Sequence, residues 1–128
     1  ENLKIDNFSI LPGSESKLLK GLEIGCTGII TATCNVTNSL SRKVYEDFIE
    51  KKQQTSNEML CNVRSVFEKF NLISGLHTIM SDEDEIYKNV LPPLILLLAP
   101  ATLRLLPRSA VSILCAVCKP WQIFLALL

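Results

Sequence analysis

The sequence predicts an α/β fold that opens with a strand–helix–strand unit and continues as helices. Two short apolar runs, residues 8–12 and 27–34, flank one amphipathic stretch, and the later apolar residues follow a helical period up to Met80. The second run is apolar on both faces at Ile29 and Ile30, which is typical of a strand in a covered parallel sheet. The connection between two such strands is expected to be right-handed.

The first unit has recognisable signals at its boundaries. The run FSILP, residues 8–12, ends at a Pro–Gly turn signal, and Ser14 is then expected to cap a helix. Gly25 is expected to end that helix before the second strand begins. The apolar face of the predicted helix consists of Leu18, Leu19 and Leu22.

The sequence after the second predicted strand has a helical spacing of apolar residues that predicts three helices. Asn38 or Ser39 is expected to cap the first, and residues 53–56 separate it from the second. Ser81 and the three carboxylates after it are expected to start a further helical turn, which the segment NVLPP ends. The apolar faces are Leu40, Val44 and Phe48 in the first helix, Leu60, Val63, Phe67 and Phe70 in the second, and Leu72, Leu76, Ile79 and Met80 in the third.

Composition excludes several classes of protein. The 128 residues carry 13 basic and 13 acidic side chains, and this zero net charge gives no reason to expect a nucleic-acid partner. The five cysteines have no disulfide-scaffold spacing, and the polar start, ENLKIDNF, lacks the apolar segment of a signal peptide. A cytoplasmic location is expected, with no metal site and no cofactor.

The last part of the chain has a different character. No acidic residue follows Glu85, and prolines and arginines interrupt an otherwise apolar stretch. Three interpretations stay open for residues 95–128: an extension read out of frame, a membrane-associating tail, and a buried helix. The second would make the chain a small non-catalytic membrane-associated or interaction protein. A spanning helix needs roughly 20 apolar residues with few charges, and no window in this stretch meets that cleanly.

Three strings together resemble a known enzyme family. They are FSILPGSES, GCTGIITATCNV and YKNVLPPL, in this order and with helices before the last. They are similar to the C-terminal part of the pyruvate-dependent class I aldolases, the family of dihydrodipicolinate synthase and N-acetylneuraminate lyase. The resemblance covers residues 8–94 and implies the last two strands and helices of a (β/α)₈ TIM barrel, followed by a helical extension. The implied division is 1–37 for the last βαβ unit, 38–94 for the helical region and 95–128 for the atypical tail.

The resemblance also implies a chemistry and a set of pocket residues. Family members form a Schiff base between a lysine and pyruvate, which then condenses with an aldehyde or is released by cleavage. The five residues that match the family's substrate pocket are Gly13, Ser14, Glu15, Ile30 and Thr31. Ile30 and Thr31 would pack beside the Schiff-base lysine, whereas Glu15 would contact the variable part of the substrate or serve as an ordinary carboxylate of a first helical turn.

The catalytic groups themselves have no counterpart in this sequence. The family's lysine lies a full helix upstream of the turn at Gly13, and Lys4 is too close to that turn to match it. Tyr45 and Tyr87 lie in helical stretches and do not match the family's catalytic tyrosine. The chain is therefore expected to be inactive alone. Exposed strand edges would in addition favour self-association.

Overall fold

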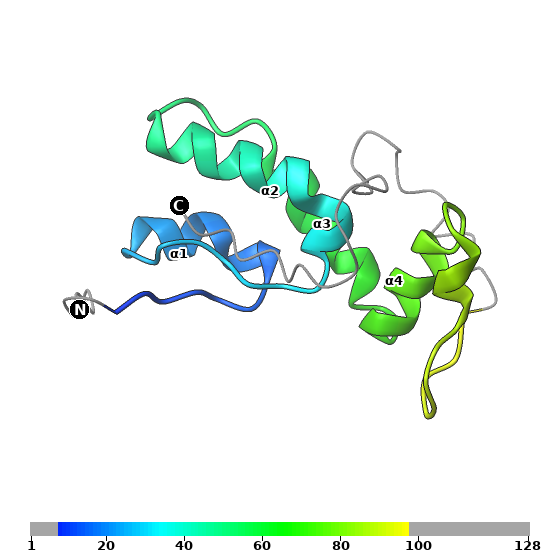
Figure 1. Cartoon of the computed structure of the whole chain (residues 1–128). Helices are drawn as coiled ribbons and strands as arrows, with labels where there is room; N and C mark the ends of the chain where they lie inside the picture. Colours follow the sequence, from blue (N-terminus) through cyan, green and yellow to red (C-terminus); the bar gives the residue numbers. More distant parts are fainter. Residues whose placement is uncertain (1–7, 98–128) are drawn as a thin grey trace.

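The computed structural model describes residues 8–97, and the expectations for residues 98–128 lie outside that range. Helices joined by extended and turn segments make up the described part (Figure 1). Helix α1 packs along α2, and α4 lies at the end of the molecule away from α1 (Figure 1). In chain order the elements are the 3-10 helix η1 (Glu15–Lys17), α1 (Leu18–Glu23), α2 (Cys34–Ile49), α3 (Asn57–Phe67), α4 (Leu72–Met80) and the 3-10 helix η2 (Glu85–Lys88).

The predicted α/β fold is wrong for the described residues, because residues 8–97 contain no β-strand and hence no TIM-barrel strands. The two segments expected to be strands are extended and lie beside each other, but only two backbone hydrogen bonds between them are formed. The amide of Thr27 donates to the Ile10 carbonyl at 3.1 Å, and that of Ile30 donates to the Pro12 carbonyl at 3.1 Å.

The geometry of this pairing explains why no sheet forms. The two acceptors are two residues apart, whereas the two donors are three residues apart, so the contacts do not build a regular parallel ladder. Pro12 lacks an N–H and cannot donate the return bond that a ladder needs at this point. An apolar run in the sequence forms a β-strand only if neighbouring strands complete its backbone hydrogen bonds.

The second extended segment is also shorter than predicted, because α2 begins at Cys34 rather than near Ser39. The amides of Cys34 and Asn35 donate to the carbonyls of Thr31 and Ala32, which turns the chain into the helix. The side-chain amide of Asn35 also donates to the Ala32 carbonyl at 2.8 Å. The predicted division after residue 37 therefore falls inside a continuous helix.

The predicted helices α1, α3 and α4 are confirmed, together with several of their boundaries. Gly25 follows α1 with a positive φ of 98°, a conformation that favours glycine after a helix. Asn71 caps α4, since its side chain accepts a hydrogen bond from the Ser74 amide at 3.1 Å. The helical turn expected directly after Ser81 begins only at Glu85. It is the short helix η2, which Asp84 caps.

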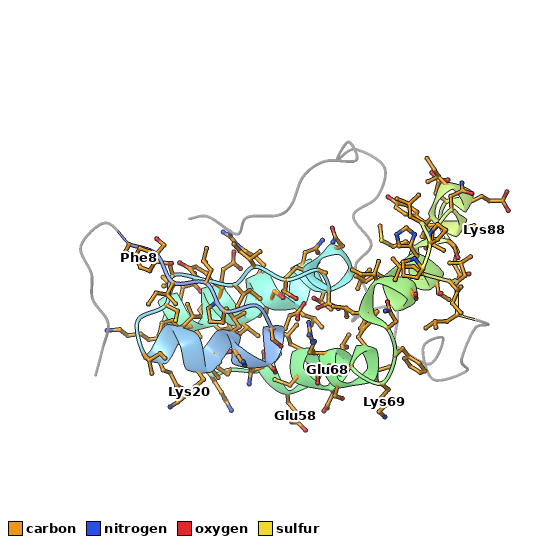
Figure 2. All side chains as sticks on the ribbon, turned by 90° about the horizontal axis from the view of Figure 1, so that it is seen from below. Phe8, Lys20, Glu58, Glu68, Lys69 and Lys88 are labelled. Carbon is orange, nitrogen blue, oxygen red and sulfur yellow. The ribbon has the colours of Figure 1, made fainter. Side chains whose placement is uncertain are left out.

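Two apolar clusters hold the helices together. The first joins α1, the second extended segment, α2 and α3 through Leu18, Leu22, Ile29, Cys34, Val44 and Leu60. The second joins α2, α3 and α4 through Val36, Val63, Phe67 and Leu76. Charged residues such as Lys20, Glu58 and Lys69 lie on the outward faces (Figure 2). Within the described range, no helix combines the length and apolar character required to cross a membrane.

Candidate functional site

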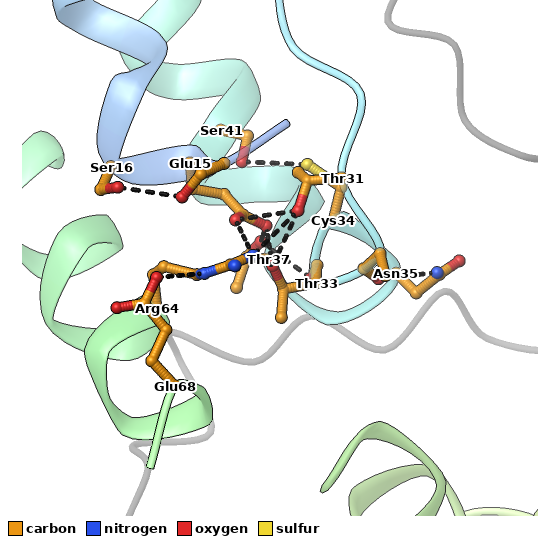
Figure 3. A network of polar contacts seen from close by, with 12 residues as sticks. Glu15, Ser16, Thr31, Thr33, Cys34, Asn35, Thr37, Ser41, Arg64 and Glu68 are labelled. Atoms are coloured by element: carbon orange, nitrogen blue, oxygen red, sulfur yellow. Dashed lines mark hydrogen bonds and ion pairs between the residues drawn. The ribbon is translucent and has the colours of Figure 1, made fainter. Parts of the chain in front are cut away.

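The five residues that match the family's substrate pocket lie together where the two extended segments end. Gly13 and Ser14 follow the first segment, and Ile30 and Thr31 lie at the end of the second. A Cβ atom added to Gly13 would lie 3.9 Å from the Ile30 carbonyl oxygen. Glu15, the first residue of η1, accepts a hydrogen bond from Thr31 at 3.1 Å (Figure 3). Their role as substrate contacts stays a prediction.

The Glu15 carboxylate is the centre of a buried polar cluster. Its side chain is 0% exposed. One oxygen, Oε2, accepts from the Thr31 hydroxyl, and the other, Oε1, accepts from the Thr33 hydroxyl. The Thr37 hydroxyl shares its one proton between Oε1 at 3.2 Å and the Thr33 carbonyl at 2.9 Å. A buried carboxylate requires such donors, because they replace the water that the charge has lost.

The remaining donor to Glu15 is Arg64, which comes from α3 and lies 49 residues further along the chain. Its Nη1 atom is 3.2 Å from Glu15 Oε2 and 3.2 Å from the hydroxyl oxygens of Thr31 and Thr33 (Figure 3). Its Nε atom donates to Glu68 at 2.9 Å. The Arg64 side chain is 14% exposed, so the ion pair with Glu15 is largely shielded from water. We call Glu15, Thr31, Thr33, Thr37 and Arg64 the Glu15 cluster.

Sequence reasoning did not find Arg64, Thr33 or Thr37. A signal exists for one pair of threonines: Thr33, the N-cap residue of α2 with helical φ and ψ, shares a face with Thr37 four residues later. Arg64 has no comparable signal, because its spacing from Glu68 is that of an ordinary exposed helix pair.

The residues that match the family's pocket differ from one another in accessibility. Gly13 is exposed, and Ile30 is 38% exposed. Thr31 is half-buried, whereas Ser14 is buried and its hydroxyl pairs with that of Ser16 at 2.9 Å. A ligand approaching from outside would therefore meet Gly13, Ile30 and Thr31 before it met Glu15.

Residues 2–101 match the dihydrodipicolinate synthetase family. The chain belongs to this family. No curated protein and no solved structure matches it. Membership of the dihydrodipicolinate synthetase family places the chain among lyase- and synthase-type proteins.

The lysines nearest to this site lack the surroundings that activate an amine. Lys17 and Lys20, in η1 and α1, are exposed, and Lys20 Nζ pairs with Glu23 at 3.0 Å. A nucleophilic lysine is activated by loss of water or by a neighbouring cation, and an exposed lysine beside a carboxylate has neither. These two residues are therefore poor candidates for the Schiff base that the resemblance to dihydrodipicolinate synthase implies.

Burial raises the pKa of two cysteine thiols, Cys34 and Cys61. Cys34 is buried, and this burial raises the pKa of its thiol to about 11, although its contact with Ser41 at 3.4 Å acts in the opposite direction. Burial also raises the pKa of Cys61, and the nearby charge of Glu15 adds to this. Since the thiolate is the reactive form, neither residue is suited to nucleophilic chemistry at neutral pH.

Within residues 8–97, His, Cys, Asp and Glu side chains form no group of three that could hold a metal ion. His77, the single histidine, lies in α4, and its Nδ1 atom is 2.8 Å from the Tyr87 carbonyl oxygen. Its ring contacts the Tyr87 ring edge to face, with centroids 6.2 Å apart. These contacts connect α4 to η2 and give His77 a structural role.

Proposed function

We propose that this chain supplies the C-terminal part of a pyruvate-binding lyase site, at which a Schiff base to pyruvate permits carbon–carbon bond formation or cleavage with an aldehyde. The pocket residues in this proposal are Gly13, Ser14, Glu15, Ile30 and Thr31. Family membership supports the general type of chemistry. The proximity of the five residues supports their assignment to one site.

The observation that carries the proposal is the contrast between a fixed interior and an accessible border. Glu15 is held by donors from three threonines and an arginine, and it fixes Thr31 beside the exposed Ile30. Binding sites need side chains that are already ordered before the ligand arrives, because ordering them on binding would cost affinity. A buried network behind a half-buried threonine has this property.

In the proposed site, this chain contributes no catalytic residue. No lysine of the sequence matches the Schiff-base position of the family, and no tyrosine matches the family's catalytic one. Acting alone, the chain would therefore bind pyruvate without forming a covalent bond to it. The Schiff-base lysine would have to be supplied by a polypeptide segment other than these 128 residues.

Borohydride trapping tests the absence of a Schiff base. The chain is incubated with isotopically labelled pyruvate and reduced, and its intact mass is measured. We expect no labelled product, since no lysine of the sequence matches the family's Schiff-base position and the exposed Lys17 and Lys20 lack the surroundings that activate an amine. Stoichiometric label on one lysine would contradict the assignment, and peptide mapping would identify that residue.

A titration followed by amide and methyl NMR tests the pocket itself. We expect added pyruvate to shift the signals of Gly13, Ile30 and Thr31, and to leave those of Thr78, in α4, unchanged. Acetate at the same concentration is the control for the carboxylate alone. If pyruvate and acetate shift no signal near Gly13, the assignment of the pocket is wrong.

A further inference from the structure

We propose that Arg64 is a positioning residue of this site, which fixes the Thr31 hydroxyl through Glu15. This inference rests on the proposed function, because Thr31 is the group that the site would present to a ligand. Neither the motif residues nor the family match assigns a role to α3 or to Arg64.

The number of hydroxyl protons determines what Arg64 contributes to the cluster. Thr31 and Thr33 each have one, and both donate it to the Glu15 carboxylate. Their two hydroxyl oxygens are nevertheless only 3.1 Å apart, with no hydroxyl proton left to join them. Arg64 Nη1 lies 3.2 Å from each of these oxygens and also from Glu15 Oε2, so its two protons are shared among three acceptors and bring the two hydroxyls together.

The position of Arg64 is itself fixed from two sides. Nη1 faces the Glu15 cluster, while Nε is held by Glu68 at 2.9 Å on the outer side. Because the guanidinium is planar, these two contacts determine both its place and its orientation. A lysine ammonium in its place would keep the charge, but it could not make the second contact from a separate nitrogen.

The surrounding charges exclude a different role for Arg64, that of binding a substrate carboxylate. One guanidinium faces two carboxylates, Glu15 at 3.2 Å and Glu68 at 2.9 Å. The charge of the guanidinium is thus already compensated by two carboxylates of the protein, and Arg64 is not free to bind a third one from a substrate. The arginine serves to compensate Glu15 and to orient the hydroxyls.

This arrangement determines how Thr31 would act on a ligand. Its proton is committed to Glu15, and one of its lone pairs accepts from Arg64. The hydroxyl consequently offers its surroundings an acceptor rather than a donor. It would favour a donor group, such as a hydroxyl of the aldehyde substrate, over the pyruvate carboxylate.

The test measures the Thr31 side-chain orientation directly. Three-bond couplings from the backbone to the Thr31 methyl carbon report the χ1 rotamer and are recorded for the unchanged chain, Arg64→Lys and Arg64→Met. The matched control is Arg42→Met, because Arg42 makes the same kind of exposed helix pair with Glu46 and no contact with the Glu15 cluster. Thr78, bonded to the Ser74 carbonyl at 2.8 Å, is the internal reference in each spectrum.

We expect one Thr31 rotamer in the unchanged chain and in Arg42→Met. In Arg64→Met and Arg64→Lys the couplings should change to rotamer-averaged values, while those of Thr78 stay constant. A Thr31 rotamer that stays fixed in Arg64→Lys would overturn the proposal. If Arg64→Met does not fold, the lysine variant decides alone, since it keeps the positive charge and the long side chain.

The pyruvate titration separates this inference from the proposed function. If pyruvate shifts the Thr31 signal of the unchanged chain, and this shift is lost in Arg64→Lys but kept in Arg42→Met, both proposals stand. If pyruvate shifts no signal while the lysine variant still frees Thr31, the positioning role holds and the pocket assignment fails. A pyruvate shift at Thr31 that persists in Arg64→Lys contradicts the role of Arg64 alone.

Discussion

Removing the Arg64 side chain should destabilise this protein far more than removing a comparable surface arginine. In Arg64→Met, Glu15 would keep its three threonine donors but lose its only ion pair in the described part of the chain. Its side chain is 0% exposed, so water could not replace the lost partner without opening the cluster. Breaking a buried ion pair costs about 3–5 kcal/mol.

The structure places the expected loss at the lower end of that range. The three hydroxyl donors still compensate part of the charge of Glu15, and the outer contact of Arg64 with the exposed Glu68 contributes less than about 1 kcal/mol. We therefore expect the free energy of unfolding to fall by about 3 kcal/mol. This is a large share of the roughly 5–15 kcal/mol typical of a small domain.

Urea denaturation followed by far-ultraviolet circular dichroism measures this loss. Arg42→Met is the control, with an expected change of about 0.5 kcal/mol or less. The double variant Glu15→Gln/Arg64→Met should be more stable than Arg64→Met, because no buried charge is then left without its partner. Equal stability of Arg64→Met and Arg42→Met would refute the reasoning, as would a double variant that is less stable than Arg64→Met.

Three other predictions concern single features of the molecule. Burial raises the pKa of Cys34 from 9.0 to about 11, so in this interval the unfolded chain has lost a proton that the folded chain keeps. The free energy of unfolding should fall by about 2–3 kcal/mol as the pH rises through the interval between these two pKa values. In Cys34→Ala the free energy of unfolding should fall by less. Gly25→Ala places a side chain at a φ of 98° and should cost about 1 kcal/mol in urea denaturation, whereas Gly25→Asn should cost less. Sedimentation velocity should show self-association, since Phe8 and Ile24 are 63% and 53% exposed; a monodisperse monomer that unfolds cooperatively would contradict this.

The helical part of this fold could be predicted because its signals are local. Leu60, Val63 and Phe67 recur at helical spacing, and all three are buried in α3. The strands could not be predicted in the same way, because a strand is defined by its hydrogen-bonded neighbours. Residues 8–12 have the composition of a strand, but Pro12 cannot donate and only one extended neighbour lies beside them within residues 8–97.

Of the candidate site, only the proximity of the motif residues could be predicted. The motif residues do come together, but sequence reasoning took Glu15 either as a substrate contact or as an ordinary carboxylate of a first helical turn. Its complete burial depends on Arg64, which is 49 residues away. A pairing over that distance is decided by the packing of α3 against η1, and no local pattern in the sequence reports it.

The burial of Glu15 also determines how it could influence a bound substrate. Direct contact with a substrate would require the Glu15 carboxylate to lose its hydrogen bonds from Thr31, Thr33, Thr37 and Arg64. Its negative charge would then lack the donors that compensate it. An effect through Thr31 has no such cost, because that hydroxyl is half-buried and already bonded to Glu15. In the proposed site, Glu15 would therefore act on a substrate by setting the direction of the Thr31 hydroxyl, and Thr31→Val should remove that effect while leaving the Glu15–Arg64 ion pair in place.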